Sequence, residues 1–271
     1  MKRSSRIFFC LLFLFSPLLW AQIEAVDQYG LPDDPEWPET SSPCYVGEMD
    51  PETRTPRWVG YLLDPAQFPD PNESDQKADR NKSSWKPYQS DEVDFSAVTT
   101  DYTNTKWDRG HLRPAATAAL DQDLMDCTHT FGNAAPQSPR FNQGTWRLLE
   151  DDVRTLTRHL GTTGVAFTGT AYTELRSKRK YIGEGICIPD FYWKVVMFKI
   201  DGELHVAAWI ISNIGHPSST PAAWYRTSID RIESYANINL FPKMPGDDEI
   251  EARVESGYWD KIWKEINAKT D

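Results

Sequence analysis

The strongest constraint on the fold is a pair of long apolar segments that are separated by an Asp-Gly dipeptide. Phe191–Ile200 and Leu204–Ser212 flank Asp201-Gly202. An Asp-Gly dipeptide between such segments favours a tight turn with positive φ angles, which connects the strands of an antiparallel hairpin. Arg57–Leu63 and Val165–Tyr172 have a similar strand-like composition. The sequence therefore predicts a mixed or antiparallel sheet that contains this hairpin.

One long amphipathic helix is predicted over Gln143–Leu160. Apolar residues recur there at spacings of three and four, which places them on one face of a helix. These residues are Trp146, Leu149, Val153, Leu156 and Leu160. Asn142 is suited to the N-cap, and Gly161 is suited to the C-terminal end. Shorter helices are expected over Thr227–Ile238 and Tyr258–Ala268. We expect one α+β domain, residues 44–268, with a central, mostly antiparallel sheet flanked by helices.

The first 43 residues differ in character from this domain. Three basic residues precede an apolar stretch over Ile7–Trp20, which is the arrangement of a secretory signal peptide. An uncleaved membrane anchor is the alternative, but the stretch is short for a span of about 20 residues. We expect removal of residues 1–21 and a secreted or periplasmic mature protein without a membrane segment. Residues 22–43, which are rich in proline and acidic residues, are interpreted as an extended leader.

Three cysteines remain after the expected removal of the signal peptide, namely Cys44, Cys127 and Cys187. In an oxidising compartment this odd number predicts one disulfide and one free thiol. The sequence does not select the pair. No spacing of Cys and His residues is typical of a structural zinc site.

The side chains suited to chemistry are concentrated between Trp107 and Glu150. This stretch contains Asp108-Arg109-Gly110-His111, Asn133-Ala-Ala-Pro-Gln137 and Phe141-Asn142-Gln-Gly-Thr-Trp146. A neutral imidazole can take a proton from water near pH 7. A guanidinium and a divalent cation can stabilise the charge that builds on phosphoryl oxygens. The combination of His, Arg, Asn and Glu therefore indicates phosphodiester hydrolysis.

In order and spacing, these motifs resemble those of the DNA/RNA non-specific endonucleases, which have the ββα-metal (His-Me finger) nuclease fold. Gly169–Tyr172, Ile188-Pro189 with Trp193–Val196, and Leu240–Pro242 look like later landmarks of that family. The resemblance covers roughly Cys44–Pro242. It implies an endonuclease that hydrolyses DNA and RNA with Mg²⁺, with Mn²⁺ as a second candidate, and members of the family are often homodimers.

The resemblance also implies a role for each motif residue. His111 would be the general base. Asn142 would be the direct protein ligand of the cation, whose other ligands are mainly water. Glu150 would hold water around the cation, Arg109 would contact or orient the phosphate, and Asn133 would support the base and the substrate.

One further arginine of the family lies shortly before a strand tryptophan. Arg54 fits best among the residues that precede Trp58, and Arg57 is a competitor. The sequence does not decide between them. Trp85 and Trp107 are candidates for stacking on bases.

The net charge of −11 argues against generic nucleic-acid binding, because phosphate contacts normally come from Lys and Arg. The activity therefore requires local clusters of basic residues together with a bound cation. Residues 176–180 (RSKRK) could guide a phosphate backbone or form a solvated loop. The loop over residues 64–95 contributes a second group of basic residues, which consists of Lys77, Arg80, Lys82 and Lys86.

Two functions other than a nuclease are compatible with the sequence. A catalytically inactive nucleic-acid-binding module on the same fold is the main alternative, although such a relative could lose His111 or Asn142 freely. A hydrolase for another kind of phosphodiester is the second alternative, and the acidic net charge is the feature that supports it.

Overall fold

The computed structural model describes residues 26, 31–32, 39–42, 44–68, 78–88, 95–214, 222–241 and 257–268. The predicted signal peptide lies outside the described residues. Among the helices of these ranges, none is long and apolar enough to cross a membrane.

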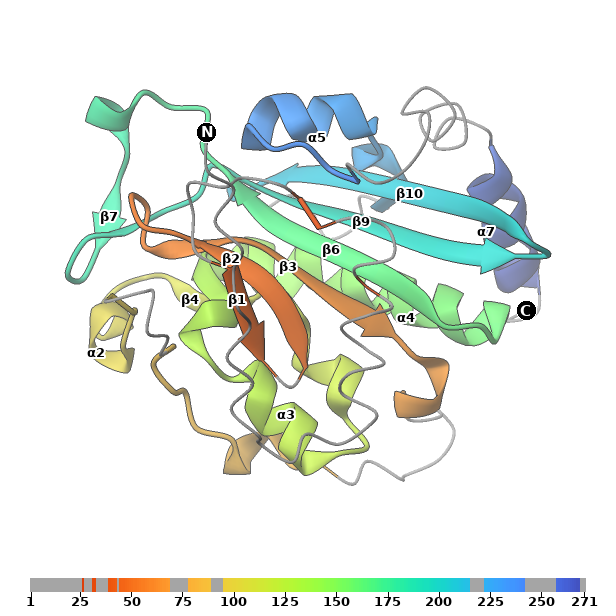
Figure 1. Ribbon diagram of the computed structural model, residues 1–271, viewed down its shortest axis with the longest axis horizontal. Coiled ribbons are helices and arrows are strands. Elements are labelled where there is room, and N and C mark those ends of the chain that lie inside the picture. Colours follow the sequence, from red (N-terminus) through yellow and green to blue (C-terminus); the bar gives the residue numbers. More distant parts are fainter. Residues whose placement is uncertain are drawn as a thin grey trace, which may run out of the picture.

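Six antiparallel strands form the central sheet, in the order β1-β2-β3-β6-β9-β10 (Figure 1). Their bounds are β1 Glu39–Ser42, β2 Tyr45–Asp50, β3 Thr55–Leu63, β6 Gly164–Ala171, β9 Phe191–Ile200 and β10 Glu203–Ser212. The predicted hairpin is confirmed, because β9 pairs with β10 and both Asp201 and Gly202 have positive φ angles, 51° and 87°. The α+β class and the antiparallel sheet are as expected.

Both faces of the sheet are covered, because its strands alternate apolar side chains between two cores. Tyr61 of β3 and Val196 of β9 point into one core, against helices α4 (Arg147–Leu160) and α7 (Tyr258–Ala268). Val195 of β9 and Ala208 of β10 point into the other core, against α5 (Ile229–Ala236). The molecule therefore has three layers, with the sheet in the middle (Figure 1).

The domain begins earlier than the expected boundary at residue 44. Strand β1, Glu39–Ser42, pairs with β2 at the edge of the sheet, and Val26 is buried in the core on the α5 side. Leu31 packs against the same core. The segment interpreted as an extended leader therefore contributes to the fold, since it supplies both a strand and apolar contacts.

A second, smaller hairpin packs against the α4 side of the sheet. Strand β4 (Asp108–His111) pairs antiparallel with β5 (Ala134–Gln137). Between them lie the short helices η3 (Ala115–Ala118), α3 (Gln122–Thr128) and η4 (Phe131–Asn133). The hairpin and α4 together form a strand–strand–helix unit.

The start of the long helix differs from its prediction. Helix α4 begins at Arg147, and Phe141–Trp146 form a wider π-helical turn, η5, with a kink at Gly144. Asn142 therefore lies inside this turn and is not an N-cap. Gly161 ends α4 in the left-handed conformation with φ 62°, as expected.

The remaining elements are short. They are η1 Pro65–Gln67, η2 Arg80–Lys82, α2 Thr99–Tyr102, η6 Arg176–Lys178, β7 Tyr181–Ile182, β8 Ile186–Cys187 and η7 Ala222–Tyr225. One disulfide joins Cys44 to Cys127 in α3, and Cys187 is a buried free thiol. The predicted single disulfide is thereby confirmed, and its pairing is resolved.

Candidate active site

His111 ends strand β4 and is enclosed by aromatic rings. Its imidazole lies with ring centroids 4.7 Å from Trp85 and 4.7 Å from His129, which meets it edge-on at 80°. Only 7% of His111 is exposed. Trp85 therefore forms a wall of this site, a position that the sequence did not specify.

Burial and nearby positive charge keep this imidazole neutral. Burial lowers the pKa of His111 well below its usual value of 6.5, and the charges of His129, Arg80 and Arg109 lower it further. The Nε2 atom is buried and has no hydrogen-bond partner among the described residues. An uncharged ring with an unused nitrogen is suited to accept a proton.

Two arginines bring positive charge to this imidazole. The Arg109 guanidinium lies over the Trp85 ring, 5.4 Å from its centroid. Arg80 begins η2 and is exposed, and its charge acts on His111, His129 and Glu150. Within the described ranges, neither arginine forms an ion pair with a carboxylate. Both guanidinium groups can therefore meet an anion at this site.

The sequence placed Arg80 in a group of basic residues but did not single it out. The loop contains four basic residues at similar spacing, and no local pattern distinguishes one of them. Asp79 is the N-cap of η2, and its side chain accepts a hydrogen bond from the Asn81 N–H. This local signal does not indicate which part of the molecule η2 approaches.

Asp108 connects the hairpin to the turn that carries Asn142. Its Oδ2 accepts hydrogen bonds from Asn142 Nδ2 and from Gln143 Nε2, each at 2.9 Å. Because the amide nitrogen of Asn142 is engaged in this way, its Oδ1 oxygen is left as the atom that can ligate a cation. The hairpin strand that ends in His111 is therefore bound directly to the candidate metal ligand.

Glu150 lies in the first turn of α4 and is half-buried. Burial raises its pKa to about 7, against the opposing charges of Lys194, Arg154 and Arg80. A carboxylate that is partly removed from water gains from a nearby cation, since the cation stabilises its ionised form. The charge of Arg80 therefore acts on both Glu150 and His111.

Lys194 of β9 is a buried cation whose charge acts on Glu150. Its Nζ donates to the hydroxyl of Tyr61 at 2.9 Å and to Thr168 Oγ1 at 2.6 Å, and it lies 5.0 Å from the centroid of the Trp146 ring. Trp146 is buried in the core, in agreement with its place on the apolar face of the predicted helix.

The donor set fits a hydrated divalent cation. Across the described residues, no cluster of three or more His, Cys, Asp or Glu side chains could enclose a metal. Asn142 Oδ1 can supply one direct oxygen ligand, and Glu150 can hold water beside it. Mg²⁺ retains several of its waters readily, so this sparse set of oxygen atoms suits Mg²⁺ better than Zn²⁺.

Asn133 is used internally. Its Oδ1 accepts from the Arg113 N–H at 2.7 Å, and its Nδ2 donates to the carbonyls of Arg113 and Thr128, each at 3.0 Å. The side chain is fully buried. Asn133 therefore fixes the backbone that follows His111, and its expected support of the base and the substrate stays a prediction.

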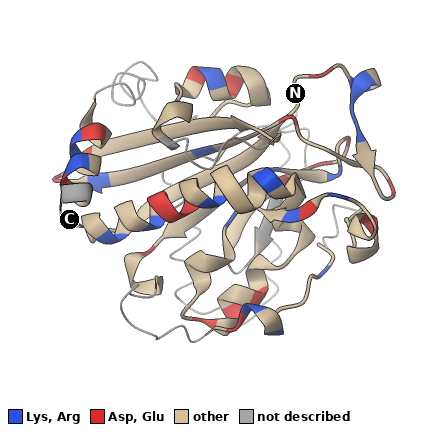
Figure 2. Cartoon of the chain, turned by 180° about the vertical axis from the view of Figure 1, so that it is seen from behind, with Lys and Arg blue, Asp and Glu red and all other residues tan. Residues whose placement is uncertain are grey.

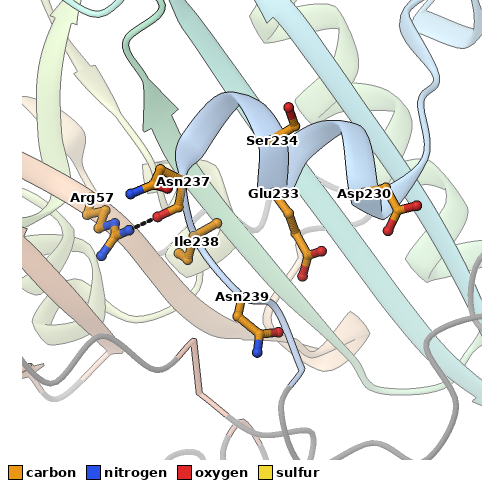
Figure 3. Close-up of a pocket in the computed structure, with 7 residues that line it drawn as sticks. All are labelled: Arg57, Asp230, Glu233, Ser234, Asn237, Ile238 and Asn239. Carbon is orange, nitrogen blue, oxygen red and sulfur yellow. Dashed lines mark hydrogen bonds between the residues drawn. The ribbon is translucent and has the colours of Figure 1, made fainter.

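Neither Arg54 nor Arg57 is among the charges that act on the pKa of His111. Arg54 donates to the carbonyl of Glu184 and lies 5.8 Å from the centroid of the Phe95 ring. Arg57 is buried beside Glu48 and donates to the carbonyl of Asn237. Figure 3 shows Arg57 at the edge of a pocket that is lined mainly by α5 and the residues after it, and α5 covers the face of the sheet opposite α4. The choice between Arg54 and Arg57 as the phosphate contact therefore stays a prediction, and Arg80 is a further candidate for that role.

Comparisons with known proteins cover this whole arrangement. Residues 27–247 match the family of DNA/RNA non-specific endonucleases. A mitochondrial endonuclease G from Bos taurus is 30% identical over 227 residues, which are 80% of this chain and 73% of that protein. Nuclease C1 from Cunninghamella echinulata is 26% identical over 209 residues, which are 74% of this chain and 81% of that protein. Among solved structures, a chain of the EndoG/EndoGI complex matches with a TM-score of 0.72 and 27% identity, over 82% of this chain and 92% of that chain.

Proposed function

The chain belongs to the DNA/RNA non-specific endonuclease family and is a metal-dependent phosphodiester endonuclease, and from this premise we propose a sugar-non-specific, Mg²⁺-dependent activity in which His111 is the general base. The observation that supports this role most directly is the buried, neutral imidazole with an unused Nε2 beside two arginines without carboxylate partners.

In this proposal, His111 Nε2 takes a proton from the attacking water. The guanidinium groups of Arg109 and Arg80 bind the phosphate and offset the charge that grows on its oxygens. Asn142 and Glu150 would hold Mg²⁺, which when bound supplies further stabilisation of charge on the phosphoryl and leaving oxygens. The oxygen of the attacking water bonds to phosphorus as the bond from phosphorus to the 3′ oxygen breaks. The 3′ oxygen leaves as a hydroxyl with a proton taken from solvent water, and the products carry 5′-phosphate ends.

Low sequence specificity follows from the same set of residues. Contacts to phosphate and sugar carry no information about base identity. The candidate groups are two guanidinium groups, an imidazole, and the amide and carboxylate that would hold the metal, and together they suit a phosphate more than the edge of a particular base. Cleavage of both DNA and RNA at many sequences is therefore the expected behaviour.

We also propose that the mature protein is secreted or periplasmic. The basic and apolar N-terminal residues support this location, and the Cys44–Cys127 disulfide supports an oxidising compartment. N-terminal sequencing of the mature protein tests it, and an uncleaved Met1 on the exported protein would argue for a membrane anchor.

Metal titration tests the proposed activity. The purified mature protein should degrade plasmid DNA and total RNA in Mg²⁺ and should lose both activities in a chelator. Asn142→Ala should raise the Mg²⁺ concentration that gives half-maximal rate, because the direct ligand is lost.

Gln143→Ala is the matched control, since Gln143 donates to the same Asp108 oxygen and is exposed. It should keep the metal requirement of the unmodified protein. A metal titration that is the same for Asn142→Ala and Gln143→Ala would remove Asn142 from the metal site. Full activity in chelator would refute the metal dependence.

A further inference from the structure

A basic arm, defined as residues 173–188 between β6 and β9, extends away from the layered body of the molecule. It contains η6 and the small β7–β8 hairpin. Figure 1 shows it at the same end as β4 and α2, whereas α7 lies at the opposite end. In Figure 2 the arm carries Lys and Arg over much of its outer part. All residues from Thr173 to Lys178 are exposed.

The base of the arm is fixed by hydrogen bonds at its first residues and near its turn. The backbone N–H groups of Thr173 and Glu174 donate to Asp190 Oδ2 at 2.8 and 3.0 Å. Further along, the Glu184 N–H donates to Asp101 Oδ1 of α2 at 2.8 Å. The arm is therefore a positioned element with defined contacts at its base.

Apolar packing connects this base to the candidate active site. Ile182 and Ile186 of the β7–β8 hairpin are buried in one cluster with Phe131, and Trp85 packs against that cluster. Trp85 is also the ring that lies 4.7 Å from His111. One ring therefore contacts both the general base and the cluster that supports the arm.

The outer part of the arm carries four basic residues, and two of them pair with Glu52, which lies outside the arm. Arg176 and Arg179 both approach Glu52 Oε1, at 3.4 and 2.8 Å. Lys178 and Lys180 are exposed and form no ion pair within the ranges that the structure describes. Next to them, Tyr181 is 45% exposed. These residues form a cationic surface with an aromatic ring, in a chain whose net charge is −11.

We propose that the basic arm binds the phosphodiester backbone of the substrate at positions away from the scissile phosphate. The inference rests on the proposed function and extends its substrate-binding surface beyond the catalytic residues. A strongly acidic chain repels a polyanion over most of its surface, so a positioned cationic element beside the active site determines how long substrates are held. Short substrates cannot reach the arm and should be indifferent to it.

Lys178→Ala/Lys180→Ala tests this proposal in two ways. The first uses a His111→Ala background, which prevents cleavage, and measures the binding constant K for a 30-bp duplex. The magnitude of the slope of log K against log salt concentration should fall by about 0.9 for each lost phosphate contact, and affinity near 0.1 M salt should drop roughly tenfold. In the otherwise unmodified enzyme, kcat/KM on long DNA and RNA should fall, whereas hydrolysis of bis(p-nitrophenyl) phosphate should not change.

Lys261→Ala/Lys264→Ala is the matched control, because it removes the same charge from exposed positions of α7 at the other end of the molecule (Figure 1). It should leave the salt slope unchanged. The proposal is overturned if the arm variant keeps the slope of the unmodified protein, or if both double variants lose affinity equally. Loss of activity on the small phosphodiester would also overturn it, since the arm would then act on the catalytic residues. If the unmodified protein hydrolyses no phosphodiester at all, the proposed function fails, and the binding measurement still decides the role of the arm.

Discussion

At the scale of single residues, the surroundings of His111 determine the pH range in which the enzyme can work. No carboxylate is among the groups that shift its pKa; burial comes first, followed by His129 and two arginines, and all of them lower it. A group with a lowered pKa stays neutral as the pH falls below its ordinary value. The proposed base is therefore available in mildly acidic as well as neutral solution.

The acid side of the activity profile should reflect this shift. We expect kcat/KM to stay level as the pH is lowered through 6.5 and to decline only at lower values, because protonation removes the base. A pH series with bis(p-nitrophenyl) phosphate at saturating Mg²⁺ measures this. A decline centred at or above pH 6.5 would mean that His111 is more solvated than the structure indicates.

Removal of the imidazole should have a large effect on rate. His111→Ala is expected to lower kcat by about 10² or more, which is the usual contribution of a positioned general base. His205→Ala is a suitable control, since His205 stacks on Tyr258 with 3.9 Å between ring centroids and lies on β10 beside α7. Equal rates for the two variants would exclude His111 as the base.

Arg80 gives a second test at this scale. Arg80→Ala should lower kcat/KM about tenfold or more, because a cation beside the phosphate is lost. It should also move the acid limb of the pH profile upward, since the charge of Arg80 helps to lower the pKa of His111. Lys82→Ala, in the same short helix, should do neither. If the acid limb of the pH profile does not move in Arg80→Ala, the charge of Arg80 does not act on the pKa of His111.

The sequence motifs indicated His111, Arg109, Asn142 and Glu150, and the structure gathers these residues around one strand–strand–helix unit. They could be predicted because they lie in short stretches of fixed spacing. Arg54 and Arg80 could not be distinguished in this way. Their positions depend on how loops cross the surface, and loop paths leave no periodic pattern in the sequence.

At the scale of elements, the long strands and α4 were predictable because each buries one face over many residues. The periodicities of β9, β10 and α4 are sustained, so an error of one residue would expose a whole apolar face. The elements that build the site are different. Strands β4 and β5 contain four residues each, and η5 is a wide turn that holds the candidate metal ligand. Their form comes from tertiary contacts such as the hydrogen bonds of Asp108.

Gly110 shows how closely the two strands of the site hairpin approach each other. A Cβ atom at this position would lie 2.1 Å from Cδ of Gln137, which is fully buried. Gly110→Ala should therefore lower the free energy of unfolding by about 1–3 kcal/mol, as expected for overpacking, and should displace His111. Urea unfolding and kcat measure the two effects.

A second substitution separates the clash from other causes. Gly110→Ala/Gln137→Ala removes the side chain that the new methyl group meets, so part of the lost stability should return relative to the sum of the single changes. Additive losses would show that the close approach to Gln137 is not the reason for a glycine at this position.

At the scale of the whole molecule, an acidic protein acts on a polyanion by concentrating its positive charge. Arg80 and Arg109 bring positive charge to His111, the basic arm is linked to the same imidazole through Trp85, and a bound cation would add to them. The net charge alone argues against nucleic-acid binding, whereas the proposed contacts with phosphate need positive charge at only a few positions. A sum over the sequence cannot show where charges of opposite sign are placed.

The disulfide gives a test that involves the entire fold. Cys44 and Cys127 are separated by 83 positions, and a cross-link that closes so long a loop is expected to stabilise the folded state by about 4 kcal/mol. It also anchors α3, whose Thr128 carbonyl accepts a hydrogen bond from Asn133 below the general base. A reductant should therefore move the urea midpoint downward and reduce activity before global unfolding.

Cys187→Ala should respond to the reductant as the unmodified protein does, because Cys187 forms no disulfide. Cys44→Ala/Cys127→Ala should begin at the lower stability and not respond to the reductant. A midpoint of the unmodified protein that is insensitive to reductant would mean that the loop entropy is offset by structure retained in the unfolded chain.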